Sequence, residues 1–355
     1  MCDSVVRMEW FVTILLLGIG LVLIIKGGDW FVDAASWIAK VSGIPAFIIG
    51  ATIVSLATTL PEVLVSTMAA GEGSVDMAIG NAIGSVNANI GLIMAISIIF
   101  MPVRFKRKDY IAKAALLLLA IALLWGLSSG GQLDVGLSFI VLAVFVVFII
   151  ENVISAKKHN DVKPTLADTI IVDEYHQVHD NPAYTVNPDG SITGKKVRVK
   201  PAGKEIAKYI ILFAIGTAGI VGGAQLLVTY GQKLASMLGV PDGIIGVTII
   251  AVGTSLPELV TTITAITKKK SELSVGNIIG ANIIDIALIL PLCSMISGGS
   301  LPVSAQTLTL DMPFCFAVAA FALIPSLITG KFHRLQGILM LAGYTVYIAL
   351  LVVRM

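Results

Sequence analysis

Apolar windows of about 20 residues, each long enough to cross a bilayer, recur along this chain. Lipid satisfies no backbone hydrogen bond, so only helices and closed barrels span a membrane. Only 13% of the 355 residues are charged, against about 25% in soluble domains. The sequence therefore predicts an all-α polytopic membrane protein with ten transmembrane helices. The windows are 8–26, 47–70, 76–100, 109–127, 133–150, 206–229, 244–266, 274–297, 311–329 and 334–353.

Basic residues gather in four connections between the windows: 104–108, 157–208, 268–270 and 331–334. With ten crossings, all four connections fall on one side of the membrane, and positive-inside bias makes that side cytoplasmic. The opposite connections, such as 71–76 and 129–134, carry acids and no Lys or Arg. We expect an integral protein of the cell (inner) membrane with both termini outside and the central loop cytoplasmic. No convincing small-residue cleavage site follows window 8–26, which is therefore interpreted as a helix and not a signal peptide.

A polar stretch, residues 155–205, divides the chain into apolar halves 1–154 and 206–355. Alternating runs at 169–175 and 191–199, with a turn-forming Asn-Pro-Asp-Gly between them, suggest a small β-hairpin or strands. The composition is typical of a partly ordered cytoplasmic linker. A regulatory ion-binding module is the alternative, although its acids lack the spacing of a calcium loop.

The two halves share sequence blocks at a constant offset of 196 residues. GATIVSLATTLPE (50–62) aligns with GVTIIAVGTSLPE (246–258), and GNAIGSVNANIGL (80–92) aligns with GNIIGANIIDIAL (276–288). Each half holds five predicted helices, an odd number, so the second half enters the membrane inverted. The sequence predicts two inverted-topology repeats of five helices, typical of secondary transporters. Their motif blocks are 43–92 and 239–288.

The first block of each half places a glutamate directly after a proline, in the middle of a span. Proline lacks an N–H, so Pro61 and Pro257 are expected to bend their helices and to free a backbone carbonyl. Residues three and four apart share a helix face. The residues on that face are Ser55, Thr58 and Glu62 in the first half and Ala251, Thr254 and Glu258 in the second.

The second block adds amides and one more acid at a spacing of four residues. If the halves pack about a pseudo-twofold axis, Glu62, Glu258, Asn89 and Asp285 converge at the centre. Oxygen ligands of this kind suit sodium or calcium, and not zinc or copper. In membrane helices Asn and Ser often only join helices, and the block glycines are expected to allow close packing. The shared faces hold Asn81, Ser85 and Asn89 in one copy and Asn277, Ala281 and Asp285 in the other.

The three carboxylates Glu62, Glu258 and Asp285 are the only acids deep in a predicted span. An Asp at the centre of a membrane helix costs roughly 2.5–3.5 kcal/mol on insertion scales. No Lys, Arg or His lies deep enough to neutralise these acids. Bound cations are the economical explanation for the buried negative charge.

At these motifs the sequence resembles the cation/calcium exchanger superfamily, specifically the prokaryotic sodium/calcium exchangers. The resemblance covers both halves and leaves out the central loop. It implies that Glu62 and Glu258 are the principal calcium ligands and that sodium uses the same two carboxylates. It also implies a helix pair, the first and the sixth, that slides past the rest. Further ligands implied by the resemblance are Thr58, Thr254, Ser85, Asn89, Asp285 and backbone oxygens near Ser55 and Ala251.

Two departures stand out. The family usually reads Gly-Ser-Asn at the start of the second block, whereas this chain has Val86 before Asn87 in the first half. In the second half Ala281 replaces the serine, so one hydroxyl expected to bind sodium is missing. The carboxylates are unaffected.

The sequence favours a calcium/sodium antiporter that works by alternating access. A calcium/proton antiporter and a cation channel are the alternatives, and a structural or receptor membrane protein leaves the buried acids unexplained. Asn89, an amide where the proton-coupled branch carries an acid, favours sodium. We expect no enzymatic activity and no cofactor. The partners expected are the lipid bilayer and the transported ions Ca2+ and Na+, with no nucleic acid and an unknown oligomeric state.

Overall fold

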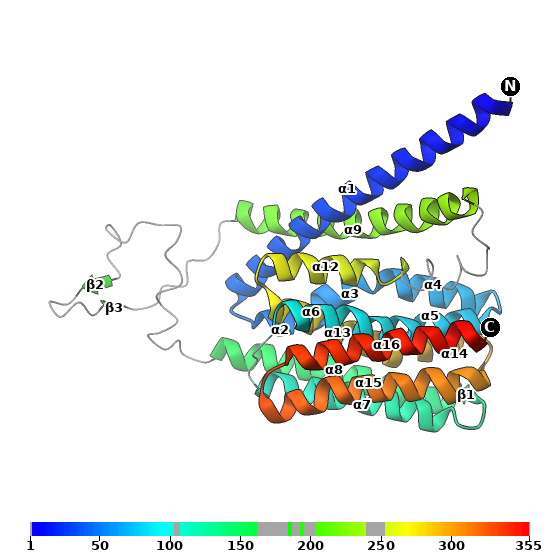
Figure 1. The fold of residues 1–355 in the computed structure, drawn as a ribbon. Coiled ribbons are helices and arrows are strands. Elements are labelled where there is room, and N and C mark those ends of the chain that lie inside the picture. The colour runs from blue at the N-terminus through cyan, green and yellow to red at the C-terminus, as the bar shows by residue number, and fades with distance from the viewer. Residues whose placement is uncertain are drawn as a thin grey trace.

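Nearly all described residues of this chain are helical (Figure 1). The computed structural model describes residues 2–102, 107–161, 184–186, 192–194, 203–238 and 253–354. The elements of the first half are α1 (Cys2–Ser42), α2 (Ala46–Ile49), η1 (Gly50–Val54), α3 (Ser55–Thr58), α4 (Leu60–Gly71), α5 (Val75–Ala88), η2 (Asn89–Met94), α6 (Ala95–Phe100), α7 (Arg107–Leu127), β1 (Gln132–Asp134) and α8 (Val135–Asp161). Those of the second half are α9 (Gly203–Met237), α12 (Leu256–Thr267), α13 (Ser271–Ile284), η6 (Asp285–Ile289), α14 (Leu290–Ile296), β4 (Ser300–Pro302), η7 (Thr307–Asp311), α15 (Met312–Thr329) and α16 (Arg334–Arg354).

The membrane-spanning segments confirm the predicted class, an all-α polytopic membrane protein. Within the described residues, eight helices are long and apolar enough to cross a bilayer, and a bent pair, 46–58 with 60–71, makes a ninth. The predicted seventh span, 244–266, is seen only as α12, because residues 244–252 lie outside the described residues. The count of ten helices in two repeats therefore stays a prediction.

Two helices are much longer than their apolar windows predicted. The first helix was expected to cover 8–26 and continues to Ser42, and the sixth was expected to cover 206–229 and continues to Met237. Lys26 ends the apolar window of α1, and the helix continues because its next turns bury Phe31, Val32 and Ala35 in an apolar cluster with α9. Asp33 also forms an ion pair with Lys268 of the α12–α13 connection at 2.8 Å. Hydropathy alone cannot anticipate such a partner.

Helices α1 and α9 lie side by side, with glycines at their contact (Figure 1). A Cβ atom added to Gly27 would lie 2.7 Å from the Ile220 amide nitrogen, and one added to Gly216 would lie 2.7 Å from the Phe31 amide nitrogen. Only glycine lets two helix backbones approach this closely. The pair also contacts α12, which carries Glu258.

Pro61 bends its helix as predicted. Segments 46–58 and 60–71 meet at an angle of 46°, and Pro61 lies in the first turn of α4, where a missing N–H is tolerated. Pro257 occupies the same place in the first turn of α12. Each motif glutamate therefore lies in the first turn of its helix, and a break precedes that turn in the case of Glu62.

The two halves interlock, because motif elements of one half pack against those of the other. Segments α2, η1 and α3 of the first half lie against α13 of the second. A Cβ on Gly276 would overlap the Phe47 carbonyl oxygen, and one on Gly280 would lie 2.5 Å from the Ser55 hydroxyl. Close packing at these two glycines is thus confirmed. A Cβ on Gly80 or Gly84 would meet no atom of the described residues within 4 Å. The segment related to 47–55 by the 196-residue offset, 243–251, lies outside the described residues.

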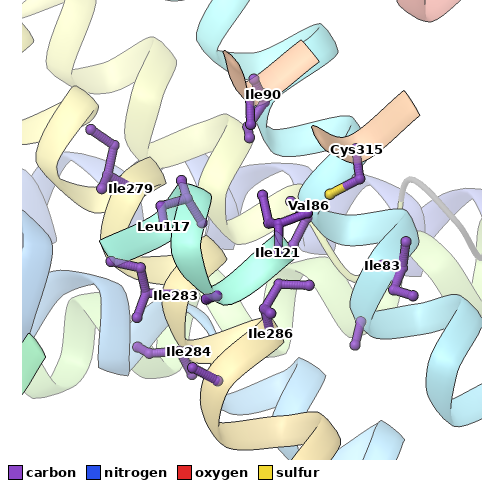
Figure 2. Close-up of a cluster of buried hydrophobic side chains, with 14 of the residues drawn as sticks. Ile83, Val86, Ile90, Leu117, Ile121, Ile279, Ile283, Ile284, Ile286 and Cys315 are labelled. Carbon is purple, nitrogen blue, oxygen red and sulfur yellow. The ribbon is translucent and has the colours of Figure 1, made fainter. Parts of the chain in front are cut away.

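An apolar cluster surrounds this interlocked centre. Figure 2 shows Val86 beside Ile121 of α7, with Ile283 and Ile286 of α13 and η6 nearby. The side chain of Val86 is fully buried, as are those of Ile283 and Ile286. The cluster excludes water from one side of the polar motif residues.

Short strands lie outside the helical bundle. The expected hairpin in the central stretch is seen as β2 (Tyr184–Val186) paired with β3 (Ile192–Gly194), across the predicted turn. The run 169–175, also expected to form a strand, lies outside the described residues. Strand β1 pairs with β4 and so links the two halves at one end of the bundle.

Figure 1 places both termini at one end of the bundle, and α8 ends and α9 begins at the opposite end. This arrangement agrees with both termini lying on one face and the central stretch on the other.

Candidate cation site

The three predicted carboxylates are buried at the interlocked centre. Glu62 is 1% exposed, and Glu258 and Asp285 are fully inaccessible. Both oxygens of Glu62 and of Asp285, and one oxygen of Glu258, have no hydrogen-bond partner among the described residues. Buried polar atoms of a folded protein normally have partners. Unsatisfied carboxylate oxygens therefore indicate a place for a ligand.

Equivalent helix contacts in the two halves bring the acids together. Helix α4, with Glu62, packs against α5 of its own half and against η6, which begins with Asp285. Helix α12, with Glu258, packs against α13 of its own half and against η2, which begins with Asn89. The expected convergence of these four residues is thus supported by the packing of the elements that carry them.

The first motif of one half contacts both motifs of the other. Thr59 donates a hydrogen bond to Glu258 Oε1 at 3.4 Å, and Thr58 donates one to Asn277 Oδ1 at 3.2 Å. Thr58 is 2% exposed and Thr59 is fully buried. Two adjacent hydroxyls at the helix break therefore reach across to the second half.

The second motif of the first half makes the reciprocal contacts. Ser85 and Thr254 approach within 3.5 Å through their hydroxyls, and Asn89 donates from Nδ2 to Asn282 Oδ1 at 3.1 Å. The remaining amide oxygen of Asn89 is buried without a partner in the described part of the chain. Thus Thr58, Ser85, Asn89 and Thr254 all lie at the contact between the halves.

Of the two predicted backbone positions, Ser55 lies within the described residues. The Ser55 carbonyl accepts from the Thr59 amide at 2.9 Å, and the Ser55 hydroxyl donates to the Thr52 carbonyl at 3.0 Å. Ser55 is fully buried against Gly280. Its counterpart Ala251 lies outside the described residues.

Asn81 and Asn277 fasten each glutamate-bearing helix to its neighbour. The Asn81 amide donates to Ser66 at 2.9 Å and to the backbone oxygen of Glu62 at 3.4 Å. The Asn277 amide donates to Thr261 at 3.2 Å. These bonds fix the helix turns from which Glu62 and Glu258 project.

A π-helical turn begins at Asn89 and another at Asp285, two positions related by the 196-residue offset. Insertions of this kind occur frequently at functional sites, since they re-aim a side chain within a helix. The sequence predicted plain helices here. Thr59 and Asn282 were likewise not predicted as site residues, although Thr59 lies in the TTLPE motif and Asn282 in the GAN motif.

No cationic side chain in the described part of the chain pairs with the acids of the centre. Within the described residues, the ion pairs of Lys and Arg involve other acids: buried Lys113 pairs with Glu151 at 2.5 Å, and Lys268 pairs with Asp29 and Asp33. No group of three His, Cys, Asp or Glu side chains in these residues is close enough to hold a metal alone. An ion at the centre would need hydroxyl, amide or backbone oxygens beside the carboxylates, as sodium and calcium accept.

The fold and this centre define a polytopic helical membrane protein with a buried acidic site shared by its two halves. Residues 12–153 and 208–353 match the family described as "Sodium/calcium exchanger protein". That match extends over most of the chain, leaving out the central stretch. The chain belongs to the sodium/calcium exchanger family.

Individual relatives are similar along almost their whole length. The sodium/calcium exchanger MaX1 of Methanosarcina acetivorans is 31% identical, covering 96% of this chain and 98% of its own. The putative antiporter CaxA of Alkalimonas amylolytica is 31% identical, covering 93% and 95%. A solved structure of the sodium-calcium exchanger NCX_Mj, soaked with Na+ and Sr2+, superposes with a TM-score of 0.76 at 26% identity, covering 96% of this chain and 98% of that one.

Proposed function

We propose that this protein is a secondary antiporter that moves calcium across a membrane in exchange for sodium. The observation that carries the proposal is the set of three buried carboxylates, bordered by hydroxyls and amides from both halves, in a chain of this family. Relatives named as a sodium/calcium exchanger and as a putative antiporter support the same reading.

We assign the cations to oxygens of both halves. Glu62 and Glu258 bind calcium, and sodium uses the same two carboxylates. Asp285 and Asn89 complete the central group. Thr58, Thr254 and Ser85 supply hydroxyls, and backbone oxygens near Ser55 and Ala251 supply carbonyls. The contacts from Thr58 to Asn277 and from Ser85 to Thr254 support this assignment.

Alternating access needs one part of the molecule to move past the other. We assign the moving part to α1 and α9, which pack on each other through glycines and contact α12 beside Glu258. A displacement of this pair exposes the acids alternately to the two faces. The five-helix repeats, residues 1–154 and 206–355 with 155–205 as linker, supply two matched half-sites.

We place the protein in the cell (inner) membrane, with both termini outside and the central stretch cytoplasmic. The support is the charge of the connections: Lys268, Lys269 and Lys270 follow α12 at the end of the bundle assigned to the cytoplasm. Strand β1, on the opposite connection, ends in an acid.

The test is calcium uptake by proteoliposomes that contain the purified protein. Vesicles loaded with sodium and diluted into sodium-free buffer should accumulate calcium, and vesicles with equal sodium on both sides should not. A proton gradient without sodium should drive no uptake. Uptake driven by the proton gradient alone would make the protein a calcium/proton antiporter, and non-saturating flux that needs no counter-ion would make it a channel.

A further inference from the structure

The two halves carry different side chains at two pairs of equivalent positions near the centre. Asn89 and Asp285 occupy equivalent positions, and each begins a π-helical turn. Three residues before them lie Val86 and Asn282, again equivalent under the 196-residue offset. Both are fully buried. One half thus has an amide where the other has an apolar side chain.

Asn282 contacts the neutral member of the central group. Its Oδ1 accepts a hydrogen bond from Asn89 Nδ2 at 3.1 Å, across the contact between the halves. An asparagine amide carries two N–H donors and one acceptor oxygen, and only the oxygen can bind a cation. Asn282 accepts from one of these N–H donors, which turns the amide so that its oxygen points away from Asn282. That oxygen is buried and has no partner among the described residues.

The other half has no such requirement. An ionised Asp285 carries two acceptor oxygens and no donor, so it needs no acceptor beside it. Helix α5, which carries Val86, packs against η6, and both oxygens of Asp285 lack partners in the described part of the chain. The difference between Val86 and Asn282 therefore follows the difference between Asp285, which needs no acceptor, and Asn89, which has one in Asn282.

We propose that Asn282 is a positioning residue that turns the Asn89 amide so that its oxygen, and not its N–H group, faces the bound cation. This inference rests on the proposed cation site. It adds that Asn282 acts only through Asn89. A free amide would present its donors to the cation in part of its orientations and so weaken binding.

The test is a double-mutant cycle on Asn282 and Asn89. Asn282→Leu keeps the volume and removes the acceptor, so the KM for calcium should rise about tenfold, near the upper end of what one buried hydrogen bond contributes. The Vmax should change much less. Asn282→Asp keeps an acceptor at this place and should raise KM less than Asn282→Leu. Val86→Leu, at the equivalent apolar position, is the matched control.

The decisive comparison is made in the Asn89→Ala background. Alanine has no amide to be turned, so adding Asn282→Leu should change the calcium KM there by less than about twofold, the range expected of independent sites. An equal tenfold loss in both backgrounds would overturn the inference, because Asn282 would then act without Asn89.

Calcium binding to the detergent-purified protein is measured beside transport, by equilibrium binding of radioactive calcium. Size-exclusion chromatography first shows which variants fold, with Asn282→Ala as a second apolar variant. If neither apolar variant folds, Asn282 serves stability and the inference is wrong. Unmodified protein that binds calcium without exchanging it for sodium would overturn the proposed function, while the binding cycle would still decide the role of Asn282.

Discussion

Glu62 and Glu258 are buried at the contact between the halves, and no cationic side chain of the described residues pairs with them. We predict that Glu62→Gln and Glu258→Gln each abolish sodium-dependent calcium uptake. The amide keeps the shape but removes the charge that binds a divalent ion, and the folded protein should survive, since a buried charge is removed. Uptake by proteoliposomes and the melting temperature are the measurements.

Glu72→Gln is the control for these variants, because Glu72 is exposed just beyond the end of α4. It should transport calcium at the unmodified rate. Unmodified transport by Glu62→Gln or Glu258→Gln would remove that residue from the ion site.

Ala281 is the position at which this chain lacks the hydroxyl that Ser85 provides in the other half. It is fully buried. We predict that Ala281→Ser lowers the sodium concentration needed for half-maximal exchange, by about fivefold if the new oxygen is worth an ordinary hydrogen bond. The measurement is calcium efflux as a function of external sodium. An unchanged sodium dependence would show that position 281 does not face the ion.

At the scale of elements, α13 can approach α2, η1 and α3 only because glycines face them. Gly280→Ala places a methyl group 2.5 Å from the Ser55 hydroxyl and 2.7 Å from the Ala51 carbonyl oxygen. Overpacking of this kind typically costs about 1–3 kcal/mol. We predict a lower melting temperature, measured by thermal unfolding in detergent, together with reduced transport.

Gly126→Ala supplies the matched control. Gly126 lies within α7, is exposed, and a Cβ there would meet nothing within 4 Å among the described residues. Alanine favours the helix by about 1 kcal/mol over glycine, so this variant should unfold at the same or a higher temperature. Equal destabilisation by both substitutions would show that the contact at Gly280 is not the cause.

The sequence predicted the helices that carry the site, but not their local geometry or the bonds between the halves. The repeat placed Glu62, Asn89 and their counterparts on opposed helices, and the packing of α4 and α12 agrees. The π-turns at Asn89 and Asp285 escaped prediction, because a shift from i→i+4 to i→i+5 bonding leaves the apolar pattern of a span unchanged. Bonds between the halves, such as Thr59 to Glu258, also escaped, since they depend on how helices meet in space.

At the scale of the whole molecule, the orientation in the membrane follows from the charged connections. We predict that a cysteine introduced at Asn187, in the central stretch and outside the described residues, reacts with membrane-impermeant reagents only from the cytoplasmic side. The measurement compares labelling of intact cells with labelling of inverted vesicles, on a background without native cysteines. A cysteine at Gly130, in the opposite connection, should show the reverse pattern, and labelling of both from one side would refute the orientation.

The charge of the centre also fixes how transport should respond to voltage. Calcium neutralises two of the three carboxylates, whereas three sodium ions would neutralise all of them, and exchange at that ratio moves one net charge per cycle. Each such charge is coupled to about 2.3 kcal/mol per 100 mV. In sodium-loaded vesicles that take up calcium, positive charge leaves, so an inside-positive potential should speed uptake and an inside-negative potential should slow it. Potentials set with potassium and valinomycin make the measurement, and an electroneutral calcium ionophore is the control. Uptake that does not respond to potential would mean that two sodium ions are exchanged for each calcium ion. The third carboxylate would then take no part in sodium binding.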